Sequence, residues 1–165
     1  MKNLFSLKER ITALLCVLLL AFVFTGCPQE AKVPDEKPTL NGTWTSTKGE
    51  VFKITDTTLS NGGSWGDCYA GDNLTVVKTD ETSGIIYIKY TRAATANWTY
   101  STDPAEAPDI GKWYAVAYKN LALHSVELAG AYKADGKTST ETLEEAKTEF
   151  SVANGYFAAY SECTK

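Results

Sequence analysis

The sequence predicts a mainly β protein: a small antiparallel β-barrel of about eight strands with one short C-terminal helix. Apolar and polar residues alternate along most segments after Leu40, and clusters of Gly, Asn and Asp separate these segments. One later segment, residues 142–150, has helical spacing instead. Roughly seven to nine strands exceed what one flat sheet holds without curling, so we expect the sheet to close into a barrel. A β-sandwich is the alternative.

The predicted strands are rich in Val, Ile, Thr and Tyr, which suit a pleated and half-buried surface. The first begins within LNGTW, and the others are residues 50–55, 73–79, 84–91, 112–120, 124–133 and 151–160. Three connections carry turn residues and are predicted as turns or loops: residues 56–63, 61–73 and 79–84.

The segment TLEEAKTEF predicts the helix, from about Thr142 to Phe150. Leu143, Ala146 and Phe150 recur at helical spacing. Thr142 is followed three residues later by Glu145, the pattern of a capping box, in which each residue satisfies a backbone N–H of the other.

The first 26 residues have the anatomy of a signal peptide. MKNLFSLKER carries three basic residues against the single Glu9, and residues 11–24 contain no charge. A basic start followed by an apolar run is typical of an export signal, and this run is too short for a comfortable membrane span. We therefore expect residues 1–26 to be removed.

The four residues FTGC, at positions 24–27, resemble the lipobox of bacterial lipoproteins. The resemblance implies a diacylglyceryl group on the Cys27 thiol, cleavage between Gly26 and Cys27, and acylation of the freed amine. Two or three acyl chains, such as palmitate, hold a protein stably on a membrane. Phe24 replaces the usual leucine, a departure that is common in spirochaete lipoboxes. An ordinary secretory signal with a chance cysteine is the alternative.

Removal of the signal leaves a tether and one domain. Residues 27–39 include three prolines and several charges, which predicts a semi-stiff lipidated linker. Residues 40–165 are enough for one domain with its own core. The expected localisation is the cell envelope, with the lipid in the outer or inner membrane and the domain facing the periplasm or the cell surface.

Charge and composition argue against several functions. The chain has a net charge of −4, and loss of residues 1–26, with three basic residues and one acidic residue, makes it about −6. An acidic chain without a basic cluster argues against nucleic-acid binding. His124 is the only histidine and no serine lies in a Gly-x-Ser-x-Gly motif, so we expect no enzyme. No Cys/His spacing predicts a metal site, and we expect no cofactor.

Two cysteines belong to the predicted domain, because Cys16 leaves with the signal and Cys27 carries the lipid. In an oxidising compartment Cys68 and Cys163 would form a disulfide. Two free buried thiols are the alternative, since not every bacterium oxidises its exported proteins.

LNGTW is similar to the Gly-x-Trp signature of lipocalins and their calycin relatives, with Gly42 and Trp44 in those places. The resemblance implies an eight-stranded barrel in which the tryptophan packs across the closed end. Arg92 is the only arginine of the mature chain, so the C-terminal arginine that lipocalins stack on this tryptophan has no expected counterpart. Phrases such as GIIYIKYT and TLEEAKTEF also resemble small spirochaete lipoproteins, a family that implies no activity.

Inward-facing strand positions supply candidate ligand-binding residues, because an eight-stranded barrel either fills its interior or holds one small ligand. An apolar lining with scattered hydroxyls suits a lipid or an aromatic molecule. The alternative is that these side chains form the core. The candidates are Phe52, Ile88, Tyr90, Tyr114, Tyr118 and Tyr132.

Candidate partner-binding residues lie on two predicted loops. Residues 92–111 form an unusually long connection that carries Trp98 and Tyr100, and the glycine-rich residues 61–73 carry Trp65. Aromatic side chains on loops are frequent anchors of recognition. The alternative is that they fold back over the mouth of the barrel.

Two functions follow from these candidates. The first is an anchored exported lipoprotein that binds a small apolar ligand in the barrel or at its mouth. The second is a surface interaction or adhesion protein that uses its loop aromatics on a host or envelope macromolecule.

Overall fold

Nine strands and one helix form within residues 36–165, the part of the chain that the computed structural model describes. These residues form one compact unit. The predicted signal peptide, Cys27 and the first part of the tether lie outside the described residues. The elements are β1 (Gly42–Ser46), β2 (Glu50–Ile54), β3 (Leu59–Gly63), β4 (Gly66–Lys78), β5 (Gly84–Ala94), β6 (Tyr100–Ser101), β7 (Trp113–Lys119), β8 (Ser125–Gly130), α2 (Leu143–Glu149) and β9 (Ser161–Thr164).

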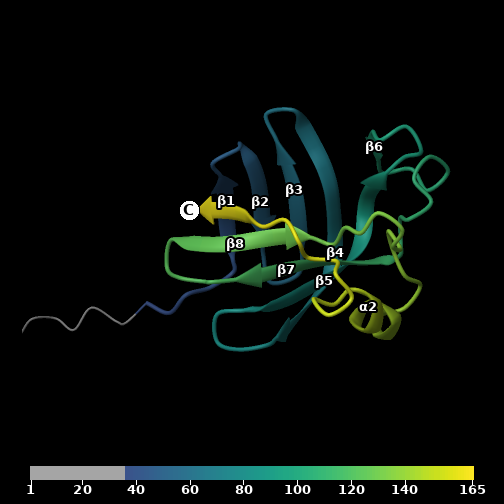
Figure 1. The fold of residues 1–165 in the computed structure, drawn as a ribbon. Helices are drawn as coiled ribbons and strands as arrows, with labels where there is room; N and C mark the ends of the chain where they lie inside the picture. The colour runs from purple at the N-terminus through teal and green to yellow at the C-terminus, as the bar shows by residue number, and fades with distance from the viewer. Residues whose placement is uncertain (1–35) are drawn as a thin grey trace, which may run out of the picture. The chain divides into compact units, whose positions relative to one another are not determined.

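Eight of these strands form a closed antiparallel barrel (Figure 1). The ring runs β4-β3-β2-β1-β9-β8-β7-β5, and the long pairing between β4 and β5 closes it. The two-residue β6 pairs with the end of β5 and stands outside the ring. The predicted barrel is confirmed, and the sandwich alternative is wrong because the sheet returns to its first strand.

Large apolar side chains fill the inward face of the barrel. Cross-strand pairs such as Trp44 with Phe52 and Ile86 with Val116 place buried residues opposite each other. These residues belong to one connected hydrophobic cluster. Burial of this apolar area is the main favourable term in the folding of the domain.

Trp44 lies toward one end of the ring, the end that carries Lys165. Its indole Nε1 donates to the Leu40 carbonyl at 2.7 Å. The Lys165 ammonium lies 4.4 Å from the centre of the Trp44 ring and also donates to the Thr39 carbonyl. The cation over Trp44 is a lysine in place of the lipocalin arginine, because a cation over an indole is attracted by the ring whichever side chain carries it.

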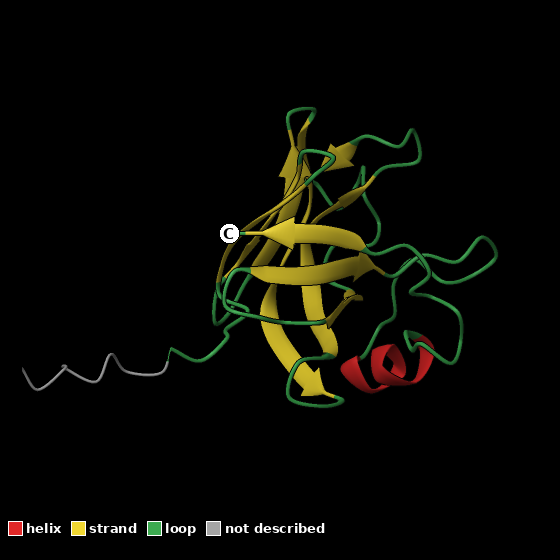
Figure 2. Cartoon of the chain, turned by 60° about the vertical axis from the view of Figure 1, so that its left-hand side comes forward, coloured by secondary structure: helices red, strands yellow, loops and turns green. Residues whose placement is uncertain are grey.

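The helix α2 lies against the outside of β5 and β7 (Figure 2). Thr142 is its N-cap, and the predicted capping box is present: Glu145 N donates to the Thr142 hydroxyl, and Thr142 N donates to the Glu145 carboxylate. Ala146, within the helix, and Phe150, its C-cap, are buried. The predicted helix is confirmed.

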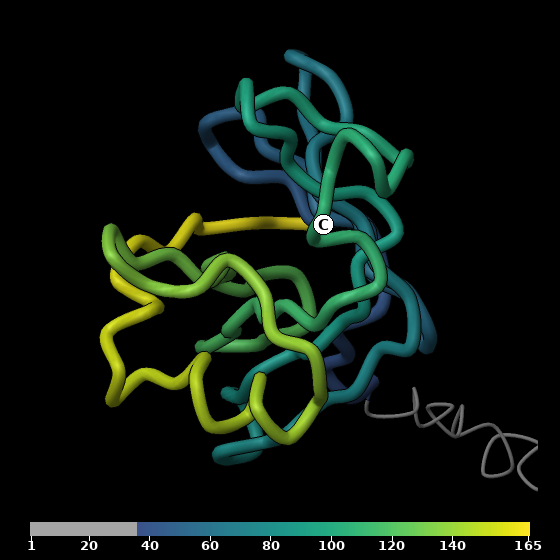
Figure 3. The backbone as a smooth tube through the Cα atoms, turned by 90° about the vertical axis from the view of Figure 1, so that its right-hand side faces the viewer, coloured from purple at the N-terminus to yellow at the C-terminus, as the bar shows by residue number. Residues whose placement is uncertain are grey.

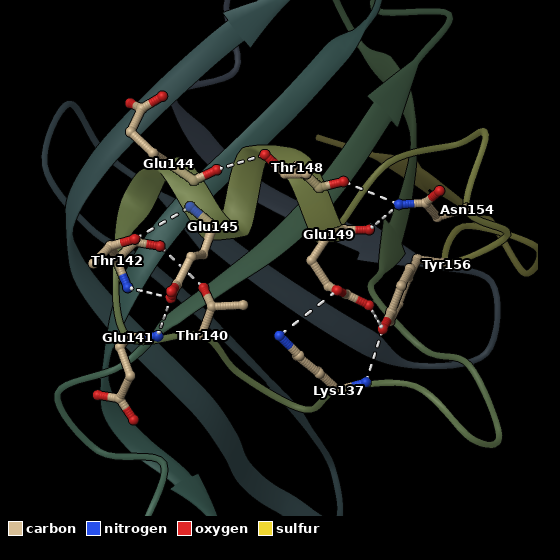
Figure 4. A network of polar contacts seen from close by, with 10 residues as sticks. All are labelled: Lys137, Thr140, Glu141, Thr142, Glu144, Glu145, Thr148, Glu149, Asn154 and Tyr156. Atoms are coloured by element: carbon tan, nitrogen blue, oxygen red, sulfur yellow. Dashed lines mark hydrogen bonds and ion pairs between the residues drawn. The ribbon is translucent and has the colours of Figure 1, made fainter.

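Residues 151–160, predicted as a strand, form turns and coil, and the last strand begins only at Ser161. The reason is a polar network at the end of α2 (Figure 4). The side-chain amide of Asn154 donates to the last carbonyls of the helix, and the Tyr156 hydroxyl donates to Glu149 while accepting from Lys137 N. These bonds turn the chain back on the helix and replace ladder pairing.

The predicted loop at residues 61–73 is instead the β3–β4 hairpin, and residues 59–63 of the predicted turn belong to β3. Turn residues lie in the strand because of close packing. A Cβ on Gly63 would lie 2.8 Å from the Trp65 indole, so glycine is needed there for contact and not for a turn.

The predicted long connection at residues 92–111 is shorter than expected. Its first residues extend β5 to Ala94, and residues 95–99 turn back into β6. In Figure 3 this hairpin lies beside the β3–β4 turn, at the top of the view. The two predicted aromatic loops therefore meet at one end of the barrel.

Candidate functional site

The end of the barrel opposite Lys165 carries the β1–β2 turn, the β3–β4 turn and the β5–β6 hairpin, and we call it the mouth. Strand alternation points a group of polar and aromatic side chains inward here, which we call the mouth cluster. Its members are Glu50, Asn61, Tyr69, Tyr90, Tyr114 and Ser161.

Three tyrosines form the aromatic part of the mouth cluster. The rings of Tyr90 and Tyr114 stack with centroids 4.8 Å apart, and Tyr69 meets Tyr114 edge-on at 5.2 Å. The Tyr114 hydroxyl donates to the Ala131 carbonyl at 3.2 Å. A Cβ on Gly130 would lie 2.6 Å from this hydroxyl, so only glycine leaves room for it.

Glu50 is the carboxylate of the mouth cluster. Its two oxygens accept from the Asn61 amide at 2.9 Å and from the Ser161 hydroxyl at 2.7 Å. No cation lies within ion-pair distance of Glu50 among the described residues. The carboxylate is therefore held by neutral donors from β3 and β9.

Burial dominates the electrostatics of the mouth. Desolvation, with smaller contributions from Tyr114 and Glu50, raises the pKa of Tyr69 well above its usual value. Desolvation likewise raises the pKa of Tyr90 and Tyr114, and Glu50 adds to the effect at Tyr114. These tyrosines are neutral hydrogen-bonding groups at physiological pH and not bases.

Below the mouth cluster the interior is filled. The predicted ligand-binding residues Phe52, Ile88 and Tyr118 are buried and belong to the single hydrophobic core. Tyr90 and Tyr114 lie above them in the mouth cluster. The structure thus places five of the six candidates inside the barrel, where they contact one another.

Tyr132 is the exception, because its predicted inward orientation is wrong. Its side chain is 71% exposed. The strand β8 ends at Gly130, and Tyr132 N donates to the Tyr156 carbonyl outside the ring. The prediction continued the inward and outward alternation of residues 124–133 to Tyr132, two residues past Gly130, where the strand pairing that fixes this alternation ends.

The predicted partner-binding aromatics form the rim of the mouth, and we call Trp65, Trp98 and Tyr100 the rim aromatics. Trp65 is 59% exposed, lies over Gly63, and donates from Nε1 to the Cys68 sulfur at 3.4 Å. Tyr100 is 39% exposed, and partial burial raises the pKa of its hydroxyl. The two predicted alternatives were exposed rings for partner binding and rings folded back over the barrel mouth. Each applies in part, because Trp65 and Tyr100 are exposed and also contact residues of the mouth.

Trp98 projects furthest, with an exposed fraction of 81%. Its backbone has φ +58°, a left-handed conformation that is rare for a bulky residue. Thr95 and Thr99 hold it there: Thr95 N donates to the Thr99 carbonyl, Trp98 N donates to the Thr95 carbonyl, and the two threonine hydroxyls are 2.7 Å apart. The hairpin tip is ordered by these bonds although its indole contacts little.

Cys68 and Cys163 are free and buried, so the free-thiol alternative holds and the predicted disulfide does not form. Cys68 lies beside Trp65 at the mouth, whereas Cys163 pairs with Val126 across β8 and β9. Desolvation, with a contribution from Glu50, raises the pKa of Cys163 to about 11. This thiol is protonated and unreactive at neutral pH.

Sequence reasoning missed Glu50, Asn61 and Ser161. The sequence predicts Asn61 in a turn and places Ser161 just after the last predicted strand. Glu50 is the polar first residue of a predicted strand, with nothing to set it apart. One signal was present: Glu50 shares its strand face with Phe52 and Ile54 at a period of two, which marks an inward carboxylate.

Two hollows occur on the outer surface. One, of about 410 Å³, lies over β8, β9 and β1, and the other, of about 590 Å³, lies between β4 and Trp113. Within residues 36–165 no group of three or more His, Cys, Asp or Glu side chains could hold a metal ion. The same residues include no helix with the length and apolar character needed to span a bilayer.

Comparison with known proteins adds no name to this geometry, because no family model, curated protein or solved structure matches the chain. The interpretation of the site therefore depends on its own contacts and exposures.

The buried tyrosines predict a loss of stability at alkaline pH. Their pKa values are raised in the folded state, so the unfolded chain releases protons first and stability falls as pH rises above about 10. Each such tyrosine contributes a slope of about 1.4 kcal/mol per pH unit. Urea unfolding between neutral pH and about pH 11 measures the slope.

Tyr114→Phe should make that slope shallower by the contribution of one tyrosine, about 1.4 kcal/mol per pH unit. Tyr132→Phe is the matched control, because the Tyr132 side chain is mostly exposed, and it should leave the slope as it is in the unmodified chain. Equal slopes for the Tyr114→Phe variant and the unmodified chain would contradict the buried position of Tyr114.

Proposed function

We propose that this chain is an exported, lipid-anchored recognition protein that presents the rim aromatics to a macromolecular partner. The barrel serves as a rigid support, and the mouth end is the contact surface. Anchoring is proposed from the signal-peptide anatomy and the lipobox-like FTGC, with Cys27 as the lipid site.

The observation that carries this proposal is the conformation of Trp98. Exposing an indole to water forgoes the free energy of its burial, and a left-handed φ at a bulky residue costs about 1–3 kcal/mol more. The threonine clamp holds the residue in this costly arrangement. Strained residues of this kind cluster at binding and active sites.

The rim aromatics suit protein recognition for a second reason. Trp and Tyr are enriched at binding hot spots, where a rigid ring enters a pocket of the partner at little entropic cost. The three rings come from two hairpins that lie side by side, and each hairpin is fixed by ladder hydrogen bonds. Binding therefore requires little ordering of the chain.

A small ligand at the mouth is the second candidate, favoured by Glu50. This carboxylate lies near Tyr69 and Tyr114 in the mouth cluster, with no cation within ion-pair distance among the described residues. A ligand would have to displace Trp65 or Tyr100 to reach it. It ranks second because the tyrosine rings already contact one another.

Replacing Trp98 tests the recognition function directly. Trp98→Gly removes the indole and suits the left-handed backbone, so the thermal unfolding midpoint should change by no more than about 3 °C. A photo-crosslinking residue at the neighbouring exposed Ala96, with Trp98 intact, should trap a specific macromolecule in intact cells of the source organism, and the same chain with Trp98→Gly should lose that partner.

The matched control carries the crosslinker at Glu81, which is exposed on the β4–β5 turn at the other end of the barrel. It should trap nothing in common with position 96. The same adducts at both positions would overturn the proposal, as would a drop of 10 °C or more for Trp98→Gly, about 3 kcal/mol, which would make the indole part of the core.

Anchoring has its own test at Cys27. In the unmodified chain the membrane fraction should contain the protein, with a mature N-terminal peptide that begins at Cys27 and carries the mass of its acyl chains. Cys27→Ser should lose the acylated peptide. A chain whose residues 1–27 are replaced by an ordinary cleaved secretory signal should move to the soluble fraction, because an acidic domain has no other attraction to anionic lipid. Membrane retention of the signal-replaced chain would contradict the lipid anchor.

A further inference from the structure

We infer that the outer hollow between β4 and Trp113 is a binding site for a pyranose ring, the six-membered ring of a sugar. The hollow measures about 590 Å³ and is lined by Thr57, Asp72, Asn73, Leu74, Thr75 and Trp113. It is separate from the mouth cluster, whose residues face the barrel interior, and so goes beyond the proposed recognition function.

A β-bulge builds one wall of the hollow. The register between β4 and β5 shifts between Asp72 and Thr75, and Asn73 adopts the left-handed φ of +52°. Leu74 N donates to the Thr57 carbonyl, which ties the bulge to the β2–β3 turn. Bulges re-aim side chains and recur beside functional sites, and this one directs residues 72 and 73 toward the hollow.

Trp113 forms the facing wall. Its backbone is fixed on both sides, because it pairs with Lys89 of β5 and exchanges two hydrogen bonds with Thr140. Its indole packs partly on the core and partly lines the hollow. The ring is thus a rigid apolar surface that needs no ordering when a ligand arrives.

The polar groups of the hollow are free to bind. Thr57 and Asn73 make their hydrogen bonds through the backbone, which leaves the Thr57 hydroxyl and the Asn73 amide open. Asp72 lies opposite Lys89 in the ladder, yet no ion pair joins them among the described residues. A carboxylate, an amide and a hydroxyl therefore surround one flat aromatic ring.

This combination selects the chemical class of the ligand. An apolar molecule would leave the carboxylate and the amide unpaired. A pyranose ring has an apolar C–H face that stacks on an indole and a rim of hydroxyls that donate to a carboxylate and exchange hydrogen bonds with an amide.

Nuclear magnetic resonance on the full chain in detergent tests the inference. The probes are cellohexaose, maltohexaose and chitohexaose at millimolar concentration. The four tryptophans give four indole N–H signals, and that of Trp113 should shift saturably with at least one probe. The Trp44 indole, buried and bonded to Leu40, is the internal reference and should not move.

Two substitutions then measure the polar contacts. Asn73→Gly keeps the left-handed backbone while removing the amide, and should weaken binding about threefold to tenfold. Asp72→Ala should weaken it about tenfold or more, since hydrogen bonds to a charged group are stronger. Asn120→Gly is the matched control, with φ +54° on the β7–β8 turn, and should bind as the unmodified chain does.

Three results would overturn the inference. The first is no shift with any of the three probes. The second is a shift of the Trp65 or Trp98 signal in place of that of Trp113, which would assign the sugar to the rim aromatics. The third is unchanged affinity in both Asp72→Ala and Asn73→Gly. Because Trp98→Gly leaves this hollow intact, the sugar result and the crosslinking result fail independently.

Discussion

The packing of aromatic side chains inside a closed eight-stranded ring is the constraint on which the rest of the structure depends. A ring of this size has an interior just wide enough for its own side chains or for one small ligand. Here Trp44, Phe52, Tyr118 and their apolar neighbours occupy that space as one cluster. The interior is then a core, and any recognition function has to be carried by the ends or the outer face of the barrel.

The two ends use aromatic rings in opposite ways. At the Lys165 end the Trp44 indole is buried, donates a hydrogen bond to the Leu40 carbonyl and lies beneath the Lys165 ammonium. At the mouth Tyr90 and Tyr114 are buried, Trp65 and Tyr100 are partly exposed, and Trp98 is left in water by a strained and clamped backbone. The asymmetry separates an end that contributes stability from an end with the properties of a contact surface.

Sequence patterns within a few residues predicted the elements that depend only on contacts between neighbouring residues. The capping box at Thr142 and Glu145 needs only neighbouring residues, and the alternation of Ile86, Ile88 and Tyr90 needs only a period of two, so both were read from the sequence. Long-range contacts decided the rest. Gly62 and Gly63 signal a turn by composition, yet they belong to a strand because Trp65 and the facing strand approach them closely.

The same distinction applies to the candidate site. Aromatic loop residues could be identified from their types, but the meeting of their two hairpins depends on β4 pairing with β5 around the ring. Glu50 could not be assigned to the mouth cluster, since its partners Asn61 and Ser161 lie 11 and 111 positions away. The β4 bulge that shapes the outer hollow has no composition signal that distinguishes Asn73 from an ordinary turn residue.

Xenon binding measures the central claim, a filled barrel, most directly. Dry apolar cavities take up xenon, whereas a close-packed core does not. The account predicts that a crystal under xenon pressure, or dissolved xenon observed by magnetic resonance, finds no site among Phe52, Ile88 and Tyr118. An ordered xenon atom between these side chains would contradict it and would restore the barrel interior as the place where a small ligand binds.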